Sequence, residues 1–195
     1  MPKIISDYER ERTLDAVIRH TKALIVEKKG IRDITVDDIV RSVGMSKGSF
    51  YSYFKSKEEC FYRVLEVAVA DVYEQVELIK KENITTKEKA VKYIENVFMS
   101  EERVDFYFAT TDVEALFRKL PPEYSQREND FSGTRLIANI MEIMEIDAVH
   151  AEAFYTLLEC IEFVSVSKIS DEAKSIVINV LTETLSDFAG KHSKV

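Results

Sequence analysis

Apolar residues recur with helical spacing along nearly the whole chain, and no segment shows the strict alternation of a half-buried strand. The first apolar stripe lies between residues 6 and 29, and Gly30 is expected to end that helix. Two short helices are predicted between residues 35 and 55. Longer ones follow over residues 57–81, 86–98, 103–120, 131–144, 148–167 and 171–189. The pattern therefore predicts an all-α protein of about nine helices.

The predicted helix starts carry capping signals. A serine or threonine at such a start can accept a hydrogen bond from a free backbone N–H, and an acidic residue three positions later can return one. The chain contains this pairing at Thr35–Asp38, Ser56–Glu59 and Thr85–Glu88. Ser46 is expected to cap the short helix that follows the break at Gly44. Residues 34–65 thus form a compact run of capped helices and tight turns.

The short helix after Ser46 has an aromatic side and a side of small and polar residues. At about 100° per residue, Phe50, Tyr53 and Phe54 share one face, which we expect to be buried. The other side carries Gly48, Tyr51, Ser52 and Lys55. Glycine inside a helix costs roughly 1 kcal/mol relative to alanine, so its presence favours a function in which another surface comes close. The major groove of DNA is such a surface, because it admits one helix.

At this point the residues resemble a family. The pattern T-x-x-x-I-x-x-x-x-G-x-S-x-G-x-x-Y-x-x-F-x-x-K is present as Thr35, Ile39, Gly44, Ser46, Gly48, Tyr51, Phe54 and Lys57. It is similar to the N-terminal domain of TetR-family transcriptional regulators, and the similarity covers about the first 60 residues. Tyr53 stands where many members carry histidine. The resemblance implies a DNA-binding domain over residues 1–56 and an effector-binding and dimerisation domain over residues 57–195.

The resemblance also implies which residues contact DNA. Thr35, Tyr51 and Lys57 would bind phosphates, and Lys47, Gly48 and Ser49 would lie nearest the bases. The full predicted set is Thr35, Ser46, Lys47, Gly48, Ser49, Tyr51, Ser52, Lys55 and Lys57. For any one of these residues alone, a plain cap or a solvated side chain is the better interpretation, and only their joint spacing favours the functional one. Arg10 and Arg12 are either further phosphate contacts or part of a solvated face.

The distribution of charge agrees with a DNA-binding head. The whole chain has a net charge of −8, which by itself argues against nucleic acid. Residues 1–60, however, contain 12 Lys and Arg against 10 Asp and Glu, and the remainder contains 15 against 25. The acidity therefore belongs to the second part. Because the first part carries a net charge of only +2, we expect dimerisation to be needed for useful affinity.

The last two predicted helices carry more apolar surface than one core needs. We expect a four-helix bundle in which two subunits contribute two helices each. The candidate interface residues are Phe154, Leu158, Phe163, Val166, Val177, Val180, Leu181 and Leu185. The alternative is that both helices close a larger monomeric core.

Aromatic residues gather in the middle of the second part, among hydroxyl and carboxyl groups. Ligand pockets are mostly apolar with a few polar groups, so this mixture suits an effector site. The candidate pocket residues are Phe98, Tyr107, Phe108, Thr111, Phe117, Tyr124 and Phe131. The same mixture also occurs in an ordinary helical core, which remains the alternative for each of these residues.

Other chemistry has little support in the sequence. Five scattered glycines form no phosphate-binding loop, and the three histidines have no metal-ligand spacing with Cys60 or Cys160. We expect no catalytic residues, no metal and no cofactor. Two isolated cysteines indicate packed thiols in a reducing compartment, and the absence of an apolar spanning segment places the protein in the cytoplasm, away from the membrane.

We therefore expect a homodimeric transcriptional regulator, in its simplest form a repressor that a small-molecule effector releases from a double-stranded DNA operator with inverted-repeat symmetry. A regulator that activates transcription, or that responds to another protein, is the nearest alternative. A helical ligand carrier or enzyme with a vestigial head is the alternative from a different class.

Overall fold

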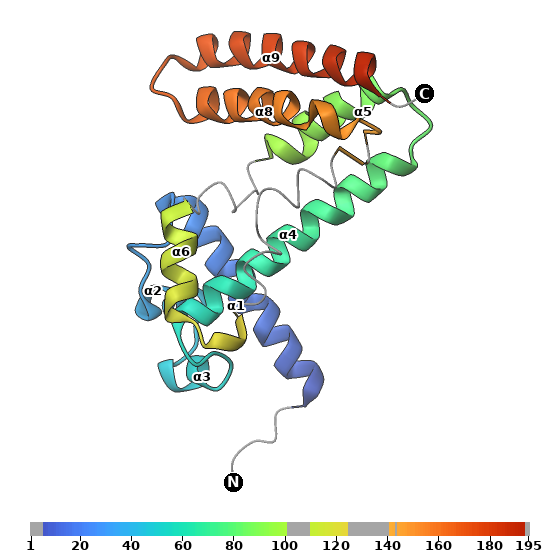
Figure 1. Cartoon of the computed structure of the whole chain (residues 1–195). Coiled ribbons are helices and arrows are strands. Elements are labelled where there is room, and N and C mark those ends of the chain that lie inside the picture. The colour runs from blue at the N-terminus through green and yellow to red at the C-terminus, as the bar shows by residue number, and fades with distance from the viewer. Residues whose placement is uncertain (1–5, 101–109, 125–140, 143, 194–195) are drawn as a thin grey trace. The chain divides into compact units, whose positions relative to one another are not determined.

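The computed structural model describes residues 6–100, 110–124, 141–142 and 144–193, and helices dominate this part of the chain (Figure 1). Its β-type pairing is limited, within those ranges, to one isolated bridge between Ile146 and Ser193. The all-α prediction is therefore confirmed. The chain divides into two compact units, one containing residues up to 70 and the α6 region, the other containing residues 71–101 and the C-terminal part.

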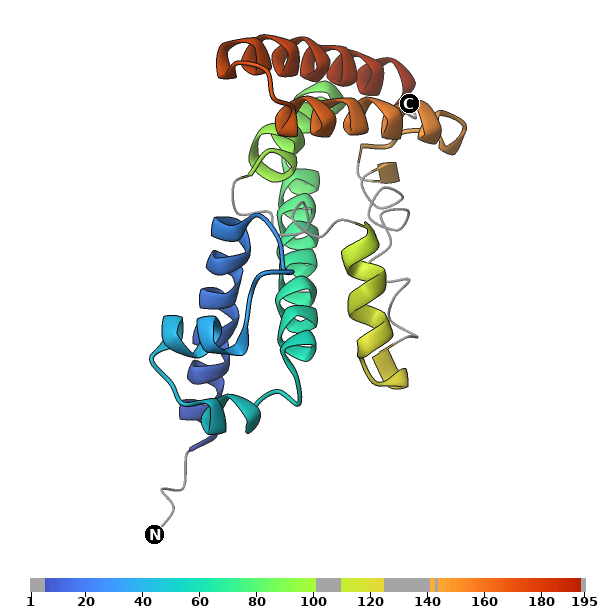
Figure 2. The same cartoon turned by 90° about the vertical axis from the view of Figure 1, so that its left-hand side faces the viewer.

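The first unit is built from α1 (Asp7–Lys28), α2 (Val36–Val43), α3 (Lys47–Tyr51), the beginning of α4 (Lys57–Lys81) and α6 (Thr110–Lys119). Its core is formed by apolar side chains that are almost fully enclosed. They include Val17, Ile25, Ile34, Ile39, Phe50, Phe54, Phe61 and Tyr62. Figures 1 and 2 show the short helices α2 and α3 beside α1, which forms the long side of this unit. Burial of these side chains, at roughly 1.5–3 kcal/mol each, stabilises this unit.

Local capping explains where the helices of the head begin and end. Ser6 caps α1 and Thr35 caps α2, and in both cases an acidic side chain at the third position closes a full capping box. The cap residue that follows α1 is Lys29, whose φ of 52° lies in the left-handed region. The cap residue that follows α2 is Gly44, with a φ of 76°. Glycine adopts that conformation without strain from a Cβ atom. The predicted boundaries of both helices are confirmed.

The segment from Ser46 to Glu59 differs from its prediction in two respects. The helix α3 ends at Tyr51, so Tyr53 and Phe54 lie in the following turn rather than on the helix. Phe50 and Phe54 are nevertheless both buried, because the Phe54 N–H bonds to the Phe50 carbonyl oxygen at 3.1 Å and the turn keeps a helical path. At the start of α4, Ser56 accepts a hydrogen bond from the Glu59 N–H, but the Glu59 carboxylate accepts from Lys55 instead of Ser56. The predicted capping box is therefore only half formed.

The second unit contains the rest of α4, α5 (Thr86–Tyr93), a π-helical turn η1 (Ile94–Phe98), a 3-10 turn η4 (Ala148–His150), α8 (Ala151–Val166) and α9 (Asp171–His192). The helices α8 and α9 lie side by side in both views, and α5 packs against α9 (Figures 1 and 2). Lys87 of α5 forms an ion pair with Asp187 of α9. The predicted caps at Thr85 and Ser170 are both present.

Two predicted helices fall partly or wholly outside the described residues. The helix expected over residues 103–120 is described from Thr110, and it ends at Lys119, just before Pro121 and Pro122. Proline cannot donate the backbone hydrogen bond that a continuing helix needs. The helix expected over residues 131–144 is described only at residues 141, 142 and 144. No described helix is both long and apolar enough to cross a lipid bilayer.

Candidate nucleic-acid interface

The short helix α3 exposes one side and anchors the other. Phe50 is completely buried, and its ring contacts those of Phe54 and Tyr51 at centroid distances of 5.3 and 5.5 Å. Tyr51 itself is 54% exposed, so its phenol extends outward from the packed ring of Phe50. Lys47, Gly48, Ser49, Ser52 and Lys55 are exposed as well. These predicted DNA contacts are thus exposed on α3 and on the turn that follows it, and Phe50 anchors the opposite side of the helix in the core.

The start of α3 is organised by serine hydroxyls. Ser46 accepts a hydrogen bond from the Ser49 N–H at 3.1 Å, and the two hydroxyls lie 2.9 Å apart. The Ser52 hydroxyl donates to the carbonyl oxygen of Ser49 at 2.6 Å. All three side chains therefore have partners within the helix and its cap. Hydroxyl groups have both donor and acceptor capacity, so each of them can still bond to a nucleic acid.

Gly48 has no packing reason to be glycine. Its φ is not in the left-handed region, and a Cβ atom built on it would meet only the Ser46 hydroxyl, at 3.8 Å. An alanine at this position would be accommodated and would be the better helix former. The glycine leaves the exposed backbone of α3 open to the close approach of another surface.

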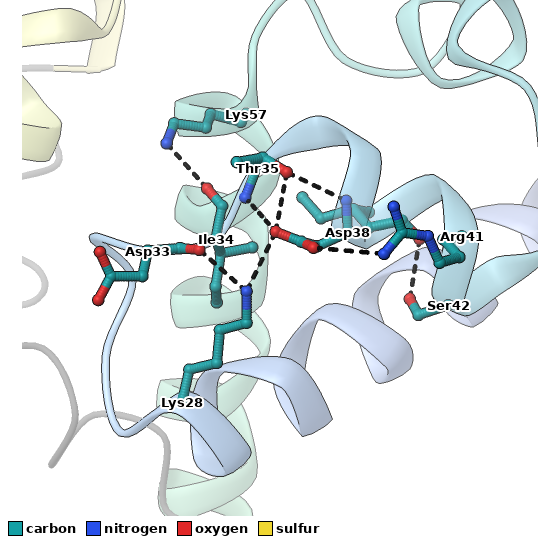
Figure 3. A network of polar contacts seen from close by, with 9 residues as sticks. Lys28, Asp33, Ile34, Thr35, Asp38, Arg41, Ser42 and Lys57 are labelled. Atoms are coloured by element: carbon teal, nitrogen blue, oxygen red, sulfur yellow. Dashed lines mark hydrogen bonds and ion pairs between the residues drawn. The ribbon is translucent and has the colours of Figure 1, made fainter.

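Thr35 and Asp38 form the centre of a polar network at the start of α2 (Figure 3). The Asp38 carboxylate accepts hydrogen bonds from the Thr35 N–H at 2.9 Å, from the Thr35 hydroxyl at 2.8 Å and from Lys28 at 3.1 Å. Arg41 lies 4.0 Å from the same carboxylate. These bonds, the one from the Thr35 backbone first, hold the pKa of Asp38 far below its usual range. Thr35 therefore caps the start of α2 and is itself exposed.

Lys57, the first residue of α4, is tied to the head. Its ammonium donates to the carbonyl oxygen of Ile34 at 2.9 Å (Figure 3). The same ammonium lies 5.8 Å from the centre of the Phe61 ring. A lysine ammonium has three donors, so two remain for a phosphate. Lys57 also lines a cleft of about 290 Å³ together with Arg32, Asp112 and Lys119. Arg32 and Asp112 close one side of this cleft with an ion pair of 2.6 Å.

Two contacts of the head were not found by reasoning from the sequence. Lys47 at the start of α3 forms an ion pair of 2.9 Å with Asp37 of α2. Arg10 of α1 lies over the ring of Tyr53 at 5.2 Å and approaches the carbonyl oxygen of Ser52 at 3.5 Å. Both pairs join residues whose side chains meet only after the helices have packed. In the sequence, the first pair is visible only as two opposite charges and the second only as a charge and an aromatic ring. No local pattern connects the positions of either pair.

The predicted effector-pocket residues are distributed over both units. Phe117 and Tyr124 belong to the first unit and surround Tyr62, with ring distances of 5.9 and 4.7 Å. The Tyr124 hydroxyl donates to Glu59 at 2.9 Å, and burial together with this carboxylate raises the pKa of Tyr124 to about 12. Phe98 is buried in the second unit. Tyr107, Phe108 and Phe131 lie outside the described residues, as does the side chain of Thr111.

The predicted interface residues divide into buried and exposed groups. Phe154, Leu158 and Leu185 are at most 3% exposed and belong to the core of the second unit, so they are already covered within one chain. Phe163 is 73% exposed and Val180 58%. Val177 is exposed, Leu181 is half-buried, and the side chain of Val166 lies outside the described residues. An exposed apolar face therefore remains on α8 and α9, and Ile176 extends it.

The sequence suggested that both cysteines are packed, but the structure buries only one of them. Cys60 is buried beside the Thr21 hydroxyl, and burial raises the pKa of its thiol to about 12. Cys160 is exposed, because it lies on the outer side of α8. The described residues contain no cluster of histidine, cysteine and acidic side chains that would suit a metal ion.

Comparisons with known proteins agree with this geometry. Residues 19–64 match the family model described as "Bacterial regulatory proteins, tetR family". A stretch of 68 residues is 32% identical to the uncharacterized HTH-type transcriptional regulator YfiR of Bacillus subtilis (strain 168). That stretch covers 35% of this chain and 32% of the relative, so the matched part spans about a third of the relative's length.

Solved structures resemble the fold over most of the chain. A transcriptional regulator from Aquifex aeolicus VF5 has a TM-score of 0.55 at 21% identity, and the match covers 90% of this chain and 96% of that one. A second structure, named as a TetR/AcrR family member, has a TM-score of 0.63 at 17% identity and covers 93% and 98%. Regulators of this kind are DNA-binding transcription factors and not enzymes. The chain thus matches the TetR family model over residues 19–64, and its all-helical fold resembles that of solved TetR/AcrR regulators.

Proposed function

We propose that the protein is a homodimeric transcriptional repressor that binds an inverted-repeat operator and is released by a small-molecule effector. The observation that carries the DNA-binding part is the exposed side of α3. It combines a glycine that packing does not require, a basic residue at the first position and a phenol anchored by a buried ring. These features suit insertion into a major groove, where residues near the start of the helix reach base edges.

The flanking helices support the same proposal. The starts of α2 and α4 carry Thr35 and Lys57, and free N–H groups at a helix start attract phosphate. Tyr51 and Lys55 add a phenol and an ammonium on the exposed side. Contacts of this type position the head on the duplex and supply most of its salt-dependent affinity.

The exposed face of α8 and α9 supports a dimer. Phe163, Ile176 and Val180 are each more than half exposed, and Val177 lies between them on α9. Exposed apolar side chains of this kind are costly in water, and a second copy of the same two helices would cover them. A two-fold dimer would also match an operator whose half-sites lie about one helical turn apart, roughly 34 Å.

The proposed effector is a small apolar molecule. Aromatic residues around Tyr62 in the first unit and Phe98 in the second were both expected near a ligand, and a small apolar molecule suits such surroundings. The repressor form is the simplest one, because a ligand that binds only the DNA-free conformation shifts the population away from the operator. Such a regulator acts where the chromosome lies, in the cytoplasm.

Selection from a pool of random duplexes, followed by sequencing, tests the proposal directly. We expect enrichment of an inverted repeat whose affinity falls steeply with salt, because each head neutralises several phosphates. The matched control is the same selection with Tyr51→Ala, which is expected to remain folded and to enrich no sequence. A folded dimer of the unchanged protein that enriches no sequence would contradict the proposal.

A further inference from the structure

Lys47, the first residue of the recognition helix, is held by an acidic residue of the neighbouring helix. Its ammonium lies 2.9 Å from the carboxylate of Asp37, the second residue of α2. The Lys47 side chain is 55% exposed and that of Asp37 58%, so the pair lies at the surface. The ion pair thus occupies the side of the head on which α2 and α3 both begin.

The carboxylate of the next residue, Asp38, has other partners than Lys47. Asp38 is satisfied by Thr35 and Lys28, and these bonds close the start of α2 (Figure 3). Asp37 is instead paired with a residue of α3. Asp38 therefore stabilises the start of its own helix, whereas Asp37 binds a predicted DNA-contacting lysine of the next helix.

The duplex and Asp37 compete for the same ammonium of Lys47. The first residue of a recognition helix lies close to the duplex, and the start of α2 is expected to face a phosphate. A carboxylate placed there repels the phosphate and also neutralises Lys47. An exposed ion pair is worth only about 0–1 kcal/mol, so a duplex can open it, but at a cost to the affinity.

We propose that Asp37 is an internal counter-ion of Lys47 that lowers the affinity of the head for double-stranded DNA. The inference rests on the proposed DNA-binding function and adds a residue that acts against it. When DNA binds, Lys47 exchanges the Asp37 carboxylate for the nucleic acid. The head therefore binds less tightly to duplexes of any sequence than its cations alone would allow.

The test compares the full-length protein with Asp37→Asn by fluorescence anisotropy on one random duplex over a range of salt concentrations. Asparagine keeps the size of the side chain and removes its charge. We expect the variant to bind about 3-fold to 10-fold more tightly per dimer at low salt. We also expect a steeper salt dependence, by up to roughly 0.9 per head in the log–log slope, because Lys47 then releases a DNA counter-ion. An equal or weaker affinity of Asp37→Asn would overturn the inference and would indicate that Asp37 orients Lys47 instead.

Two controls separate the ion pair from a general effect of charge. Asp33→Asn makes the same change of charge in the loop before α2, where its carboxylate points away from the polar network in Figure 3, and we expect less than about a 2-fold change. In a Lys47→Gln background, Asp37→Asn should lose most of its effect, since a double-mutant cycle isolates the coupling of the two residues. Equal effects in both backgrounds would overturn the inference.

The same measurements distinguish this inference from the proposed function. If the unchanged protein and all variants fail to bind any duplex at low salt while remaining folded, the proposed function fails, and the inference with it. If the unchanged protein binds and Asp37→Asn matches it, only the inference fails.

Discussion

The ammonium of Lys57 lies 2.9 Å from the backbone carbonyl oxygen of Ile34, and this bond ties the first residue of α4 to the residue that precedes the cap of α2. Ile34 is itself completely buried. One lysine thereby links two helix starts that are both expected to face phosphates. Its loss should affect the stability of the head as well as its contact with DNA.

We expect Lys57→Ala to weaken binding to all duplexes and to reduce the log–log salt slope by about 1 per head. The lost hydrogen bond should also lower the free energy of unfolding by about 0.5–1.5 kcal/mol. Lys57→Gln is the matched control, because it removes the charge but retains a donor. It should change the salt slope as much as alanine does and the stability less. An unchanged slope in both variants would remove Lys57 from the phosphate contacts.

Gly48→Ala should have opposite effects on stability and binding. The structure leaves room for a methyl group, and alanine is the better helix former, so the free protein should be stabilised by roughly 0.5–1 kcal/mol. The same methyl group would lie on the side of α3 that approaches the operator, and we expect at least roughly a 10-fold loss of affinity. Thermal unfolding and anisotropy measure the two effects. A variant that is both more stable and equally active would mean that α3 does not approach DNA closely at this point.

The carboxylate of Asp38 should contribute a stability that disappears in acid. Its pKa in the folded protein is lowered, chiefly by the Thr35 backbone N–H, so folding favours the ionised form. The contribution is complete above the ordinary value of about 3.9 and is lost as the pH falls from there through the lowered value. The difference in melting temperature between the unchanged protein and Asp38→Asn should be constant from about pH 5 to 8 and should shrink below about pH 4.

Circular dichroism at each pH provides this measurement. Asp33→Asn is a suitable control, because that carboxylate points away from the network in Figure 3. Its effect should stay within about 0.5 kcal/mol at every pH. If the difference in melting temperature between the unchanged protein and Asp38→Asn stays the same between pH 3 and 7, the network does not stabilise the ionised form of Asp38.

Val180→Lys should separate the two subunits of the proposed dimer. Val180 is 58% exposed on α9, so the change is tolerated by the single chain. In a dimer it would bury an unpaired ammonium, at a cost of roughly 3–5 kcal/mol. We expect a monomer in sedimentation velocity at micromolar concentration. Leu78→Lys makes a similar change at another exposed apolar residue, on α4, and should leave the dimer intact. A dimeric Val180→Lys would place the interface elsewhere.

The two thiols should differ strongly in reactivity. The thiolate is the reactive form, and burial raises the pKa of Cys60 to about 12, so this thiol stays protonated and shielded. Cys160 is exposed on α8, three residues before Phe163. A thiol-specific reagent should therefore modify one cysteine in the folded protein and the second only after unfolding. Cys160→Ser should abolish the fast reaction, and fast labelling of Cys60 in that variant would show that the core around it opens readily.

Helix boundaries were the most predictable feature of this protein. Ser46, Thr85 and Ser170 each accept a hydrogen bond from the N–H three residues later, as their sequence context predicts. Ser56 also accepts the bond from the Glu59 N–H, but the Glu59 carboxylate accepts from the Lys55 N–H and does not complete a capping box with Ser56. Local patterns decide which groups are within reach. They do not decide from which of two neighbouring N–H groups a flexible carboxylate accepts a hydrogen bond.

Periodicity was less informative about the C-terminal pair of helices. Leu158 and Phe163 both belong to the broad apolar stripe of α8, yet one is buried and the other is 73% exposed. A stripe that is apolar on more than one side does not say which side faces its own chain. The packing of α5, α8 and α9 settles that question within the unit.

The sequence by itself determined the all-α class, the helix-turn-helix pattern and most helix ends, because capping and periodicity act between residues a few positions apart. The tertiary structure alone decided that Asp37 holds Lys47, that Lys57 binds the carbonyl of Ile34 and that Arg10 lies over Tyr53. Each of these contacts joins residues 10 or more positions apart in the sequence. Their geometry depends on how buried side chains such as Phe50 and Ile34 fit together, and no local pattern encodes that fit.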